Sequence, residues 1–312
     1  MPYSDQLCIT FNGEIYNYKE LKADLVAKGY TFSNVTDTEV ILAGYKAYGT
    51  EFFKALRGMF AFALLDQEKQ VTFLVRDGLG IKPLYYFKNQ HSLYFASEVK
   101  AFKAYRENWE ENQDWPIYFL SFGFIPEPFT TLKDVFSLAK GHYWAWNHQT
   151  QQAEATKFID DYPTTENIKD AAASTKNLLD KAVKRHLISD APIGVFLSGG
   201  IDSSLLSLFA NEQHAQTINT ISINFNEPEF SEQQYQGIIV QQIQSKHISY
   251  TVTAKDFEQH IGQIFADMDQ PSNDGINSWF VNKVAKENGL KAVLSGIGAD
   301  EIYGGYPSFK RH

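Results

Sequence analysis

The sequence predicts an α+β sandwich in the first half of the chain and an α/β unit with a parallel sheet in the second. Three observations lead to this fold class. A length of 312 residues suits about two domains of roughly 150 residues each. Up to about residue 153, short segments rich in Phe and Val indicate strands with a few helices between them. From about residue 165 onward, strands and helices alternate, and the predicted domains are therefore residues 1–153 and 165–312.

The first half begins with a strand, because apolar Leu7, Ile9 and Phe11 alternate with Cys8 and Thr10. The further predicted elements are strands at 59–65, 71–75 and 92–96 and helices at 18–28 and 36–49. The second helix opens with a Thr-x-x-Glu capping box at residues 36–39. Residues 105–115 form a polar, aromatic stretch between the two halves, and the prolines at 126 and 128 predict loops. Residues 149–155 and 160–165 are read as linkers.

The second half shows a βαβα rhythm. Its predicted elements are a helix at 166–186, a strand at 193–197, a helix after residue 203, a strand at 218–225, a helix opened by residues 231–234, a strand at 248–252, helices at 256–268 and 278–288, and a strand at 291–294. Such a sheet is parallel and carries helices on both faces. Ligands bind beyond the carboxyl ends of its strands.

Composition excludes several classes of function. A net charge of -9 argues against a general nucleic-acid binder. The single cysteine, Cys8, excludes an internal disulfide framework and predicts the reduced cytoplasm. The first residues lack the pattern of a signal peptide, and no apolar run reaches the roughly 18 residues of a membrane span. The eight histidines form no HExxH pair, so a built-in zinc site is not expected.

The stretch SGGIDSS, residues 198–204, joins the predicted strand at 193–197 to a helix. Gly199 and Gly200 let the backbone turn sharply and approach a ligand closely. The helix that follows directs free N–H groups at the turn, which favours a phosphate chain. Asp202 would repel phosphate unless Mg²⁺ lies between them. The alternative is an ordinary turn with Ser203 as N-cap, but it does not explain the whole string.

A second glycine-rich stretch, SGIGADEIYGGY at residues 295–306, again follows a predicted strand. We expect Ser295 and Gly296 to lie at the tip of a strand near Ser198. Asp300 and Glu301 would then offer a second carboxylate for the same metal ion. Taken alone, this stretch favours a glycine-rich loop carrying a solvated acid pair, but beside SGGIDSS the nucleotide interpretation is favoured.

Several motifs resemble one known family. SGGIDSS resembles the pyrophosphatase loop of ATP-pyrophosphatases, and SGIGADEIYGGY resembles the later nucleotide loop of glutamine-dependent asparagine synthetases. Four stretches resemble the class II glutamine amidotransferase domain of that family, namely FNGEIYNY (11–18), TDTEVIL (36–42), RDGLGIKPLYY (76–86) and ASEVKAF (96–102). The resemblance implies an N-terminal nucleophile-type sandwich followed by an ATP-pyrophosphatase domain.

The resemblance also implies roles for individual residues. Asn12 and Gly13 match the oxyanion hole of glutamine hydrolysis, and Glu14 and Asp37 match residues that hold the α-amino group of glutamine. An acid in the first turn of a helix would explain Asp37 equally well. The remaining matches are Ser198, Gly199, Gly200, Asp202 and Ser203 for pyrophosphate, Leu197, Ile223, Ser295 and Gly296 for adenosine and its ribose, and Asp202 and Asp300 for Mg²⁺.

Three features depart from the family pattern. The family's nucleophile is a cysteine at the mature N-terminus, and neither Cys8, which lies in a predicted strand, nor Pro2 matches it. The family's synthetase domain continues past the position of His312 into a helical part. Ile297 stands where many asparagine synthetases have Glu. We therefore expect an incomplete form, truncated at both ends, in which glutaminase activity is absent.

The leading interpretation is an asparagine synthetase-type amidotransferase that uses ATP, Mg²⁺, glutamine and aspartate, or another carboxylic acid, and forms AMP and pyrophosphate. A homodimer, or a separate chain that supplies missing segments, stays open. One alternative is a non-catalytic nucleotide-binding remnant or subunit. Another is an amidotransferase that acts on a different acid in a biosynthetic cluster, an option that Ile297 keeps open. A third, a tRNA-thiolating enzyme or NAD synthetase, is disfavoured by the amidotransferase half.

Overall fold

Two units make up the structure, a computed structural model that describes residues 6–159, 170–188, 191–214, 217–227, 231–306 and 309. Unit 1 comprises Met1–Thr164 and Asp269–Asn273, and unit 2 comprises Thr165–Met268 and Asp274–His312. The sequence analysis placed residues 269–273 in the second half, whereas they pack with the first. The predicted linker at 160–165 lies outside the described residues, as does the start of the helix predicted at 166.

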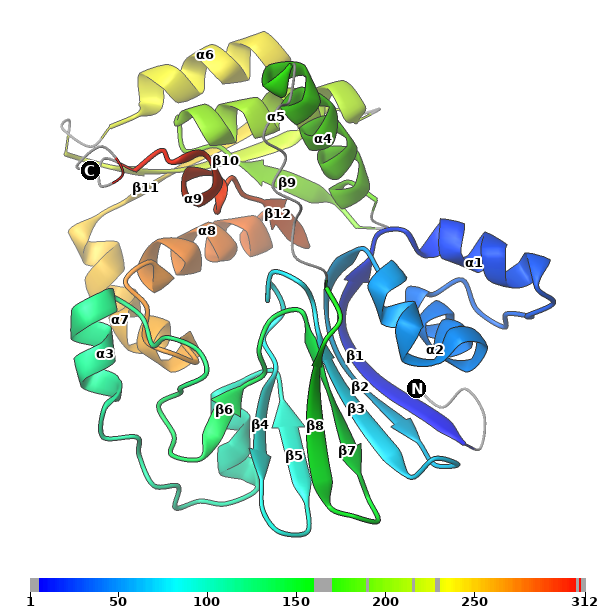
Figure 1. Cartoon of the computed structure of the whole chain (residues 1–312). Helices are drawn as coiled ribbons and strands as arrows, with labels where there is room; N and C mark the ends of the chain where they lie inside the picture. The colour runs from blue at the N-terminus through cyan, green and yellow to red at the C-terminus, as the bar shows by residue number, and fades with distance from the viewer. Residues whose placement is uncertain are drawn as a thin grey trace. The chain divides into compact units, whose positions relative to one another are not determined.

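Unit 1 contains a five-stranded antiparallel sheet in the order β1-β2-β3-β7-β8 (Figure 1). Its strands are β1 (Leu7–Ile15), β2 (Gly58–Asp66), β3 (Val71–Arg76), β7 (His142–Asn147) and β8 (Gln152–Lys157). The strands predicted at 7–11, 59–65 and 71–75 are confirmed. The linker predicted at 149–155 is wrong, because residues 152–157 pair with β7 and complete the sheet.

The side chains of β2 alternate between two apolar cores. Phe60 and Phe62 are buried on the face covered by α1 (Tyr18–Ala27) and α2 (Asp37–Tyr48). Ala61 and Ala63 point to the other face, where they pack with side chains of a second, smaller sheet. That sheet has the antiparallel order β5-β4-β6 and consists of β5 (Leu93–Ala96), β4 (Tyr85–Lys88) and β6 (Val135–Ser137). The predicted α+β sandwich is therefore confirmed.

The start of α2 follows only half of the predicted capping box. The Thr36 side chain accepts the backbone N–H of Glu39, as a capping residue does. The Glu39 carboxylate accepts the N–H groups of Ser33 and Asn34 at 2.8 and 2.7 Å. This buried acid therefore organises the loop before the helix.

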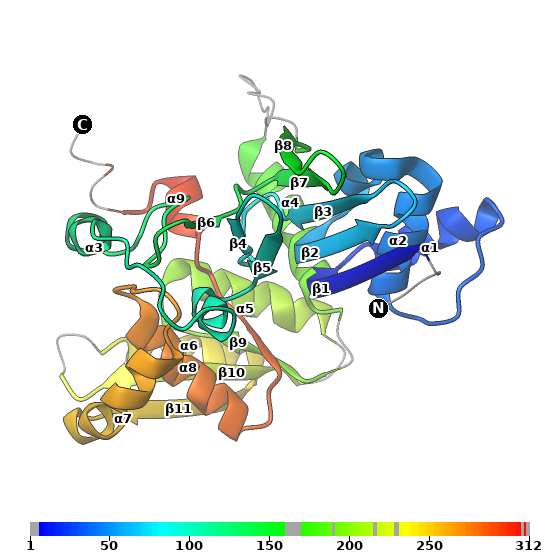
Figure 2. The same ribbon diagram turned by 90° about the horizontal axis from the view of Figure 1, so that it is seen from below.

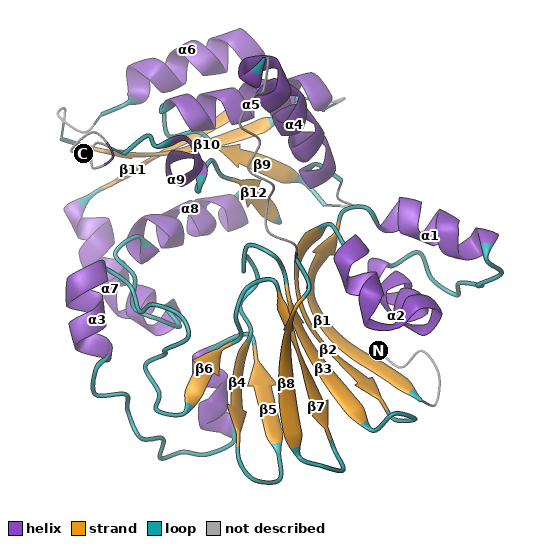
Figure 3. Cartoon of the chain, viewed as in Figure 1, coloured by secondary structure: helices purple, strands orange, loops and turns teal. Residues whose placement is uncertain are grey.

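Several elements lie where the sequence analysis predicted no helix. They are α3 (Trp115–Phe122) and the 3-10 helices η1 (Gly49–Ala55) and η2 (Val99–Ala104) (Figure 3). Helix α3 has a proline in its first turn and ends at Gly123, which adopts a φ of 78°. Proline fits the first turn of a helix because the missing N–H would be unpaired there. The prolines around this segment were read as loop signals, and that prediction missed α3.

Unit 2 contains a four-stranded parallel sheet in the order β11-β10-β9-β12 (Figure 1). Its strands are β9 (Ile193–Phe196), β10 (Asn219–Phe225), β11 (Lys246–Val252) and β12 (Ala292–Leu294). The chain runs from β9 through β10 to β11 in one direction, and β12 then pairs with the opposite side of β9. The strand order reverses at β9, and ligands of such sheets bind at the carboxyl ends of the strands where that happens. The predicted α/β class is confirmed.

Helices cover both faces of the parallel sheet (Figures 1 and 2). They are α4 (Ala171–His186), α5 (Ile201–Gln213), α6 (Gln233–Ile243), α7 (Ala254–Asp267), α8 (Gly275–Glu287) and the short α9 (Ala299–Tyr303). One core joins the sheet to α4, α5 and α6, and two others join it to α7 and α8. No helix in the described part of the chain is long and apolar enough to cross a membrane.

Two predicted helix starts in unit 2 are wrong. Helix α5 begins at Ile201 with Gly200 as its N-cap, so Ser203 lies inside its first turn and is not the cap. Helix α6 has Glu232 at its N-cap position and no side-chain capping bond, so Ser231 does not open it. The Ser203 hydroxyl instead bonds within the loop, to Ser198 and to the carbonyl of Gly200. The sequence analysis also placed the start of α7 at residue 256, although Thr253 caps it in a complete capping box.

Candidate functional site

Asn12 and Gly13 lie near the end of β1, at the edge of a cavity of about 340 Å³. Asn12 lines this cavity, and its Nδ2 donates to Ser97 Oγ at 3.1 Å. Gly13 has a φ of +149°, and a Cβ there would lie 2.1 Å from the carbonyl oxygen of Met59 on β2. Only glycine fits so close an approach of two strands. The structure thus places the Asn12 side-chain amide next to a glycine whose position excludes any larger residue.

Cys8 lies on β1, half-buried and paired with Leu65 of β2. Asn12 is four residues further along the same strand, which corresponds to roughly 13 Å at about 3.3 Å per residue. A thiol at that separation cannot attack a carbon whose oxygen is held by Asn12, since reacting atoms must come within roughly 3 to 3.5 Å. The geometry agrees with the expectation that Cys8 is not a nucleophile.

Glu14 lies near the end of β1, and Asp37 bonds to the last residue of that strand. Asp37, the first residue of α2, accepts the backbone N–H of Ile15 on Oδ2 at 3.0 Å. Glu14 is exposed on the adjacent position of β1. Burial, Glu14 and Asp77 together raise the pKa of Tyr16 to about 12. Neither carboxylate lines the cavity beside Asn12; Glu14 is two residues from Asn12 along the chain, and Asp37 reaches the end of the same strand through its bond to Ile15.

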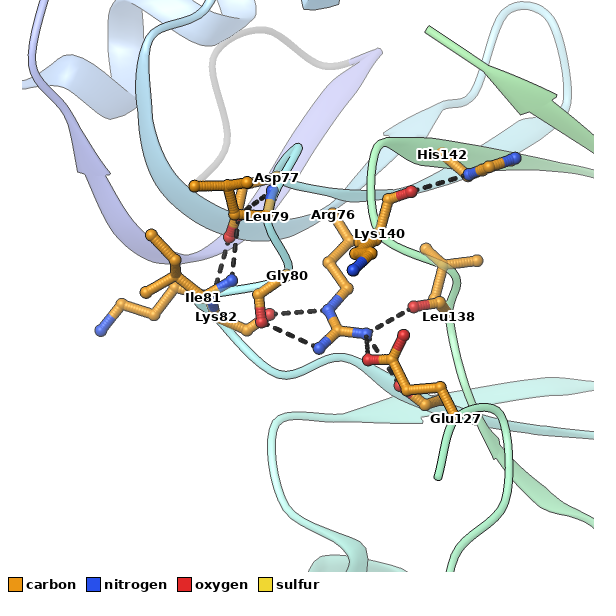
Figure 4. Close-up of polar contacts among 11 residues, drawn as sticks. Arg76, Asp77, Leu79, Gly80, Ile81, Lys82, Glu127, Leu138, Lys140 and His142 are labelled. Carbon is orange, nitrogen blue, oxygen red and sulfur yellow. Dashed lines mark hydrogen bonds and ion pairs between the residues drawn. The ribbon is translucent and has the colours of Figure 1, made fainter. Parts of the chain in front are cut away.

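The motif RDGLGIK supports this site from behind (Figure 4). Asp77 is buried and accepts four backbone N–H groups, those of Phe60, Leu79, Ile81 and Lys82. Phe60 is the residue that pairs with Gly13 across the sheet. Asp77 therefore fixes the strand against which the glycine packs, and it also closes the loop that follows β3.

The buried guanidinium of Arg76 binds the same loop from the other side (Figure 4). Its Nη1 donates to Glu127 Oε1 at 2.6 Å, to Ser137 Oγ at 2.8 Å and to the Leu138 carbonyl at 2.7 Å. Its Nε and Nη2 donate to the carbonyls of Lys82 and Gly80 at 3.0 and 2.9 Å. The motif thus forms a hydrogen-bond network that joins separate loops of unit 1.

In unit 2, the two glycine-rich stretches meet at the point where the strand order reverses. The loop after β9 carries Ser198 to Ser204, and the loop after β12 carries Ser295 and Gly296. A Cβ on Gly296 would lie 3.1 Å from Asp202 Cβ and 3.3 Å from the backbone nitrogen of Ser203. Because the loops touch here, a ligand bound at the start of α5 would contact both.

The first loop is built for a close backbone approach. Gly199 has a φ of +101°, and a Cβ there would lie 2.8 Å from Glu232 Cβ. The hydroxyls of Ser198 and Ser203 lie 2.9 Å apart, and Ser203 Oγ donates to the carbonyl of Gly200. No side chain caps the N-terminus of α5, which leaves its first N–H groups for a ligand. This arrangement can accept a phosphate chain.

Asp202 and Asp300 bring two carboxylates to these loops. Burial first, and then the charge of Asp300, raises the pKa of Asp202. Two carboxylates near a phosphate site fit Mg²⁺, which is typically bound through one or two carboxylates together with phosphate oxygens. Among the described residues, no group of three or more His, Cys, Asp or Glu side chains is arranged to hold a metal ion alone.

A cavity of about 370 Å³ lies beside the two loops in unit 2. Of the predicted nucleotide-binding residues, Ser198, Ile223 and Ser295 line it. Leu197 and Ser203 are buried in the wall behind, and Gly199, Gly200, Asp202, Gly296 and Asp300 lie in the loops without lining the cavity. Ile297 lines it and is 78% exposed, so its apolar side chain faces the open space.

The sequence analysis missed a polar pair that holds the first loop. Gln236 on α6 is buried, and its Nε2 donates to the Ser198 carbonyl and to Asn224 Oδ1, each at 3.1 Å. Asn224 on β10 is also buried and donates to Ser249 Oγ at 2.9 Å. Both residues line the cavity. Gln236 is one of five glutamines in α6, so the local sequence carried no signal that set it apart.

Two family models cover most of the chain. The glutamine amidotransferase domain model matches residues 1–159, and the asparagine synthase model matches residues 174–312. A solved glutamine phosphoribosylpyrophosphate amidotransferase of Bacillus subtilis aligns with a TM-score of 0.39 and 13% identity over 86% of this chain and 76% of that one.

Curated relatives match nearly the whole sequence. Asparagine synthetase [glutamine-hydrolyzing] 1 of Bacillus subtilis is 35% identical over 99% of this chain and 49% of its own length. Asparagine synthetase B [glutamine-hydrolyzing] of Escherichia coli is 29% identical over 97% and 53%. Amidase chry2 of Gibberella zeae is 26% identical over 96% and 47%. The chain spans about half the length of these relatives.

Proposed function

Because the chain belongs to the family of glutamine-hydrolysing asparagine synthetases, which joins a glutamine amidotransferase domain to an asparagine synthase domain, we propose that it serves ATP-driven amide formation. The observation that carries the proposal is the contact of the two glycine-rich loops where the strand order of unit 2 reverses. The relatives are about twice as long as this chain, and their complete reaction is part of the proposal.

Unit 1 would bind glutamine and stabilise the oxyanion of its hydrolysis, and the attacking nucleophile would be a group other than Cys8. The Asn12 side-chain amide and the Gly13 N–H would donate to the oxyanion that forms when the glutamine amide carbon is attacked, and Glu14 and Asp37 would bind the α-ammonium group. The close packing of Gly13 on β2, backed by the bond from Phe60 N–H to Asp77, supports this assignment, since it holds the donor in one orientation.

Unit 2 would activate the acceptor acid. A carboxylate oxygen attacks the α-phosphorus of ATP, the bond to the bridging oxygen breaks, and pyrophosphate leaves. Ammonia then attacks the acyl carbon of the adenylate, loses a proton and displaces AMP. The loop at 198–204 would hold the pyrophosphate portion, and Leu197, Ile223, Ser295 and Gly296 would surround the nucleoside.

Asp202 and Asp300 would hold Mg²⁺, which when bound neutralises charge on the phosphates. The chain's own contribution is the orientation of the two carboxylates. Gly305 lies so close to Asp300 that a Cβ there would be 1.9 Å from Oδ1, and the Asp300 carbonyl accepts the Gly305 N–H at 3.0 Å. Asp300 is therefore held in place by its own loop.

The proposed acceptor acid is aspartate, as the names of the synthetase relatives suggest. A second candidate is a different carboxylic acid. The observation that favours it is Ile297, whose exposed apolar side chain faces the cavity beside the loops and offers no charged contact. The likeness to a protein named an amidase is consistent with that alternative.

Nucleotide binding tests the proposal directly. Calorimetry of the full-length protein with ATP should give Mg²⁺-dependent binding, and Asp202→Asn should remove the dependence on Mg²⁺. Glu258→Gln, which changes an exposed acid on α7, is the matched control and should bind like the wild type. Equal binding by the wild type and Asp202→Asn with Mg²⁺ would exclude the proposed role of Asp202.

Turnover tests the reaction class. The protein is given ATP, Mg²⁺ and ammonium with aspartate, or with a panel of other carboxylic acids, and AMP and amide are measured together. Equal amounts of AMP and asparagine would support aspartate as the acceptor, and the same result with another acid would support the second candidate. Nucleotide binding without AMP for any acid would favour a non-catalytic nucleotide-binding chain.

A further inference from the structure

Five residues, Asp269–Asn273, belong to unit 1 although the chain on both sides of them belongs to unit 2. They lie between α7 and α8 in the sequence, and we call them the strap. Within unit 1 the strap contacts three separate loops, which begin at residues 97, 123 and 130. Few short segments satisfy so many backbone groups of distant loops, which suggests that the strap fixes their conformation.

The Asp269 carboxylate binds the start of η2. Its Oδ2 accepts the backbone N–H of Val99 at 2.6 Å, and its Oδ1 accepts that of Lys100 at 2.8 Å. The first N–H groups of a helix have no partner within the helix. Hydrogen bonds to a charged acceptor are roughly twice as strong as neutral ones. One carboxylate thus fixes the orientation of this turn through both of its oxygens.

The next strap residues set the register. Gln270 Oε1 accepts the Thr131 N–H at 3.1 Å, and Gln270 Nε2 donates to Thr131 Oγ1 at 3.2 Å. The backbone N–H of Asn273 donates to the Gly123 carbonyl at 3.0 Å. These bonds hold the strap at both ends, so Asp269 has little freedom to leave η2.

The turn that Asp269 binds also carries Ser97, two residues before Val99. Ser97 Oγ accepts one hydrogen of the Asn12 side-chain amide at 3.1 Å, and both residues line the same cavity. An Asn amide nitrogen carries two hydrogens. With one hydrogen directed at Ser97, the other has a defined direction in which to meet an oxyanion.

We propose that Asp269 is a positioning residue for the glutamine half-reaction, which fixes the turn that carries Ser97 and so orients the Asn12 amide. The inference rests on the proposed function of unit 1. Asp269 would thus orient the Asn12 side-chain amide without contacting it. A small misplacement of a catalytic group typically costs about a hundredfold in rate. We therefore expect Asp269→Asn to lower kcat for glutamine hydrolysis about tenfold to a hundredfold, with KM little changed.

Asp269→Asn is the sharpest perturbation, because it keeps the shape and removes one acceptor. The amide can accept only one of the two N–H groups and turns its own NH₂ toward the other. Ser97→Ala removes the next link without disturbing the strap. Asp114→Asn, at an exposed position of unit 1, is the matched control. Thermal unfolding of each variant shows whether it is folded.

Two measurements decide the proposal. The first is the side-chain amide resonance of Asn12 in ¹⁵N-labelled full-length protein without ligand, assigned by its absence in Asn12→Asp. We expect it to shift in Asp269→Asn and in Ser97→Ala and to stay in place in Asp114→Asn. An unmoved resonance in a folded Asp269→Asn protein would overturn the proposal, and so would a fully additive shift in the double variant.

The second measurement is steady-state glutamine hydrolysis. The losses in kcat from Asp269→Asn and Ser97→Ala should not add in the double variant, since both act through Asn12, whereas additive losses would overturn the proposal. A wild type that does not hydrolyse glutamine would agree with the lack of a cysteine at the family's nucleophile position, and the amide resonance alone would then test the proposal. The amide resonance still decides whether Asp269 positions Asn12. Should Asp269→Asn not fold, Asp269→Glu and Ser97→Ala provide the same comparison.

Discussion

Removal of the Arg76 guanidinium should be among the most damaging single changes in unit 1. We consider Arg76→Met, which keeps an apolar chain of similar length and removes all five donated hydrogen bonds. The contact with Glu127 is the shortest of the five, but the Glu127 side chain is 45% exposed, so water can replace the lost partner. The main penalty should therefore come from the buried acceptors.

Two acceptors are almost fully buried, Ser137 Oγ and the Leu138 carbonyl. A buried polar group that loses its partner costs about 1 to 3 kcal/mol. Two such groups give about 2 to 6 kcal/mol, which agrees with the roughly 3 to 5 kcal/mol observed when one partner of a buried pair is removed. Domains are typically stable by about 5 to 15 kcal/mol, so the change should lower the stability of unit 1 severely.

Urea unfolding monitored by tryptophan fluorescence measures the effect, and Lys133→Met is the control. Lys133 pairs with Glu110 at 2.7 Å, nearly the same distance, but both side chains are more than half exposed. Exposed pairs contribute little, so no resolved change is expected in the control. A loss of less than about 1 kcal/mol in Arg76→Met would refute the reasoning that buried acceptors dominate.

Three further changes have defined outcomes. Gly13→Ala places a Cβ 2.1 Å from a backbone oxygen of β2, so it should cost about 1 to 3 kcal/mol in urea unfolding, whereas Gly237→Ala, in open space, should not destabilise. Burial raises the pKa of Asp66, but the Lys69 N–H, the Tyr45 hydroxyl and the Lys69 ammonium together lower it. Stability from this group is present above its unfolded pKa of 3.8 and is lost as pH falls through the folded value. Tyr45→Phe should therefore make Tm fall less steeply as the pH is lowered. An unchanged dependence of Tm on pH would contradict the role given to the bond from Tyr45 to Asp66. Cys8→Ser should leave any glutamine hydrolysis intact, and its abolition would make Cys8 the nucleophile.

Much of the fold was predictable because the signals are local. Alternation at Leu7, Ile9 and Phe11 gave the first strand, and the βαβα rhythm gave the parallel sheet. The prediction failed where a local signal had two meanings. The prolines at 126 and 128 were read as loop signals and the helix before them, α3, was missed, and residues 152–157 form a strand because β7 offers them a pairing edge.

The candidate site divides in the same way. The glycines at 13, 199 and 296 stand out in the sequence because of the motifs around them. A larger residue is excluded at each position by a few atoms that a Cβ would meet. Gln236 and Asn224 were missed, since their role depends on a loop carbonyl more than 25 residues away along the chain. A pattern in the sequence does not show which distant backbone group will need a hydrogen bond from a side chain.

By itself, therefore, the sequence determined most strands and helices and the two glycine-rich loops, although not β4, β6, β7 or β8, because side-chain periodicity and backbone sterics act over a few residues. Only the tertiary structure decided that Asp269–Asn273 joins unit 1, that Asp269 binds the start of η2, and that Arg76 donates to residues about 60 positions away. The physical reason is that a buried hydrogen-bonding group must find a partner, and folding decides which partners come within reach.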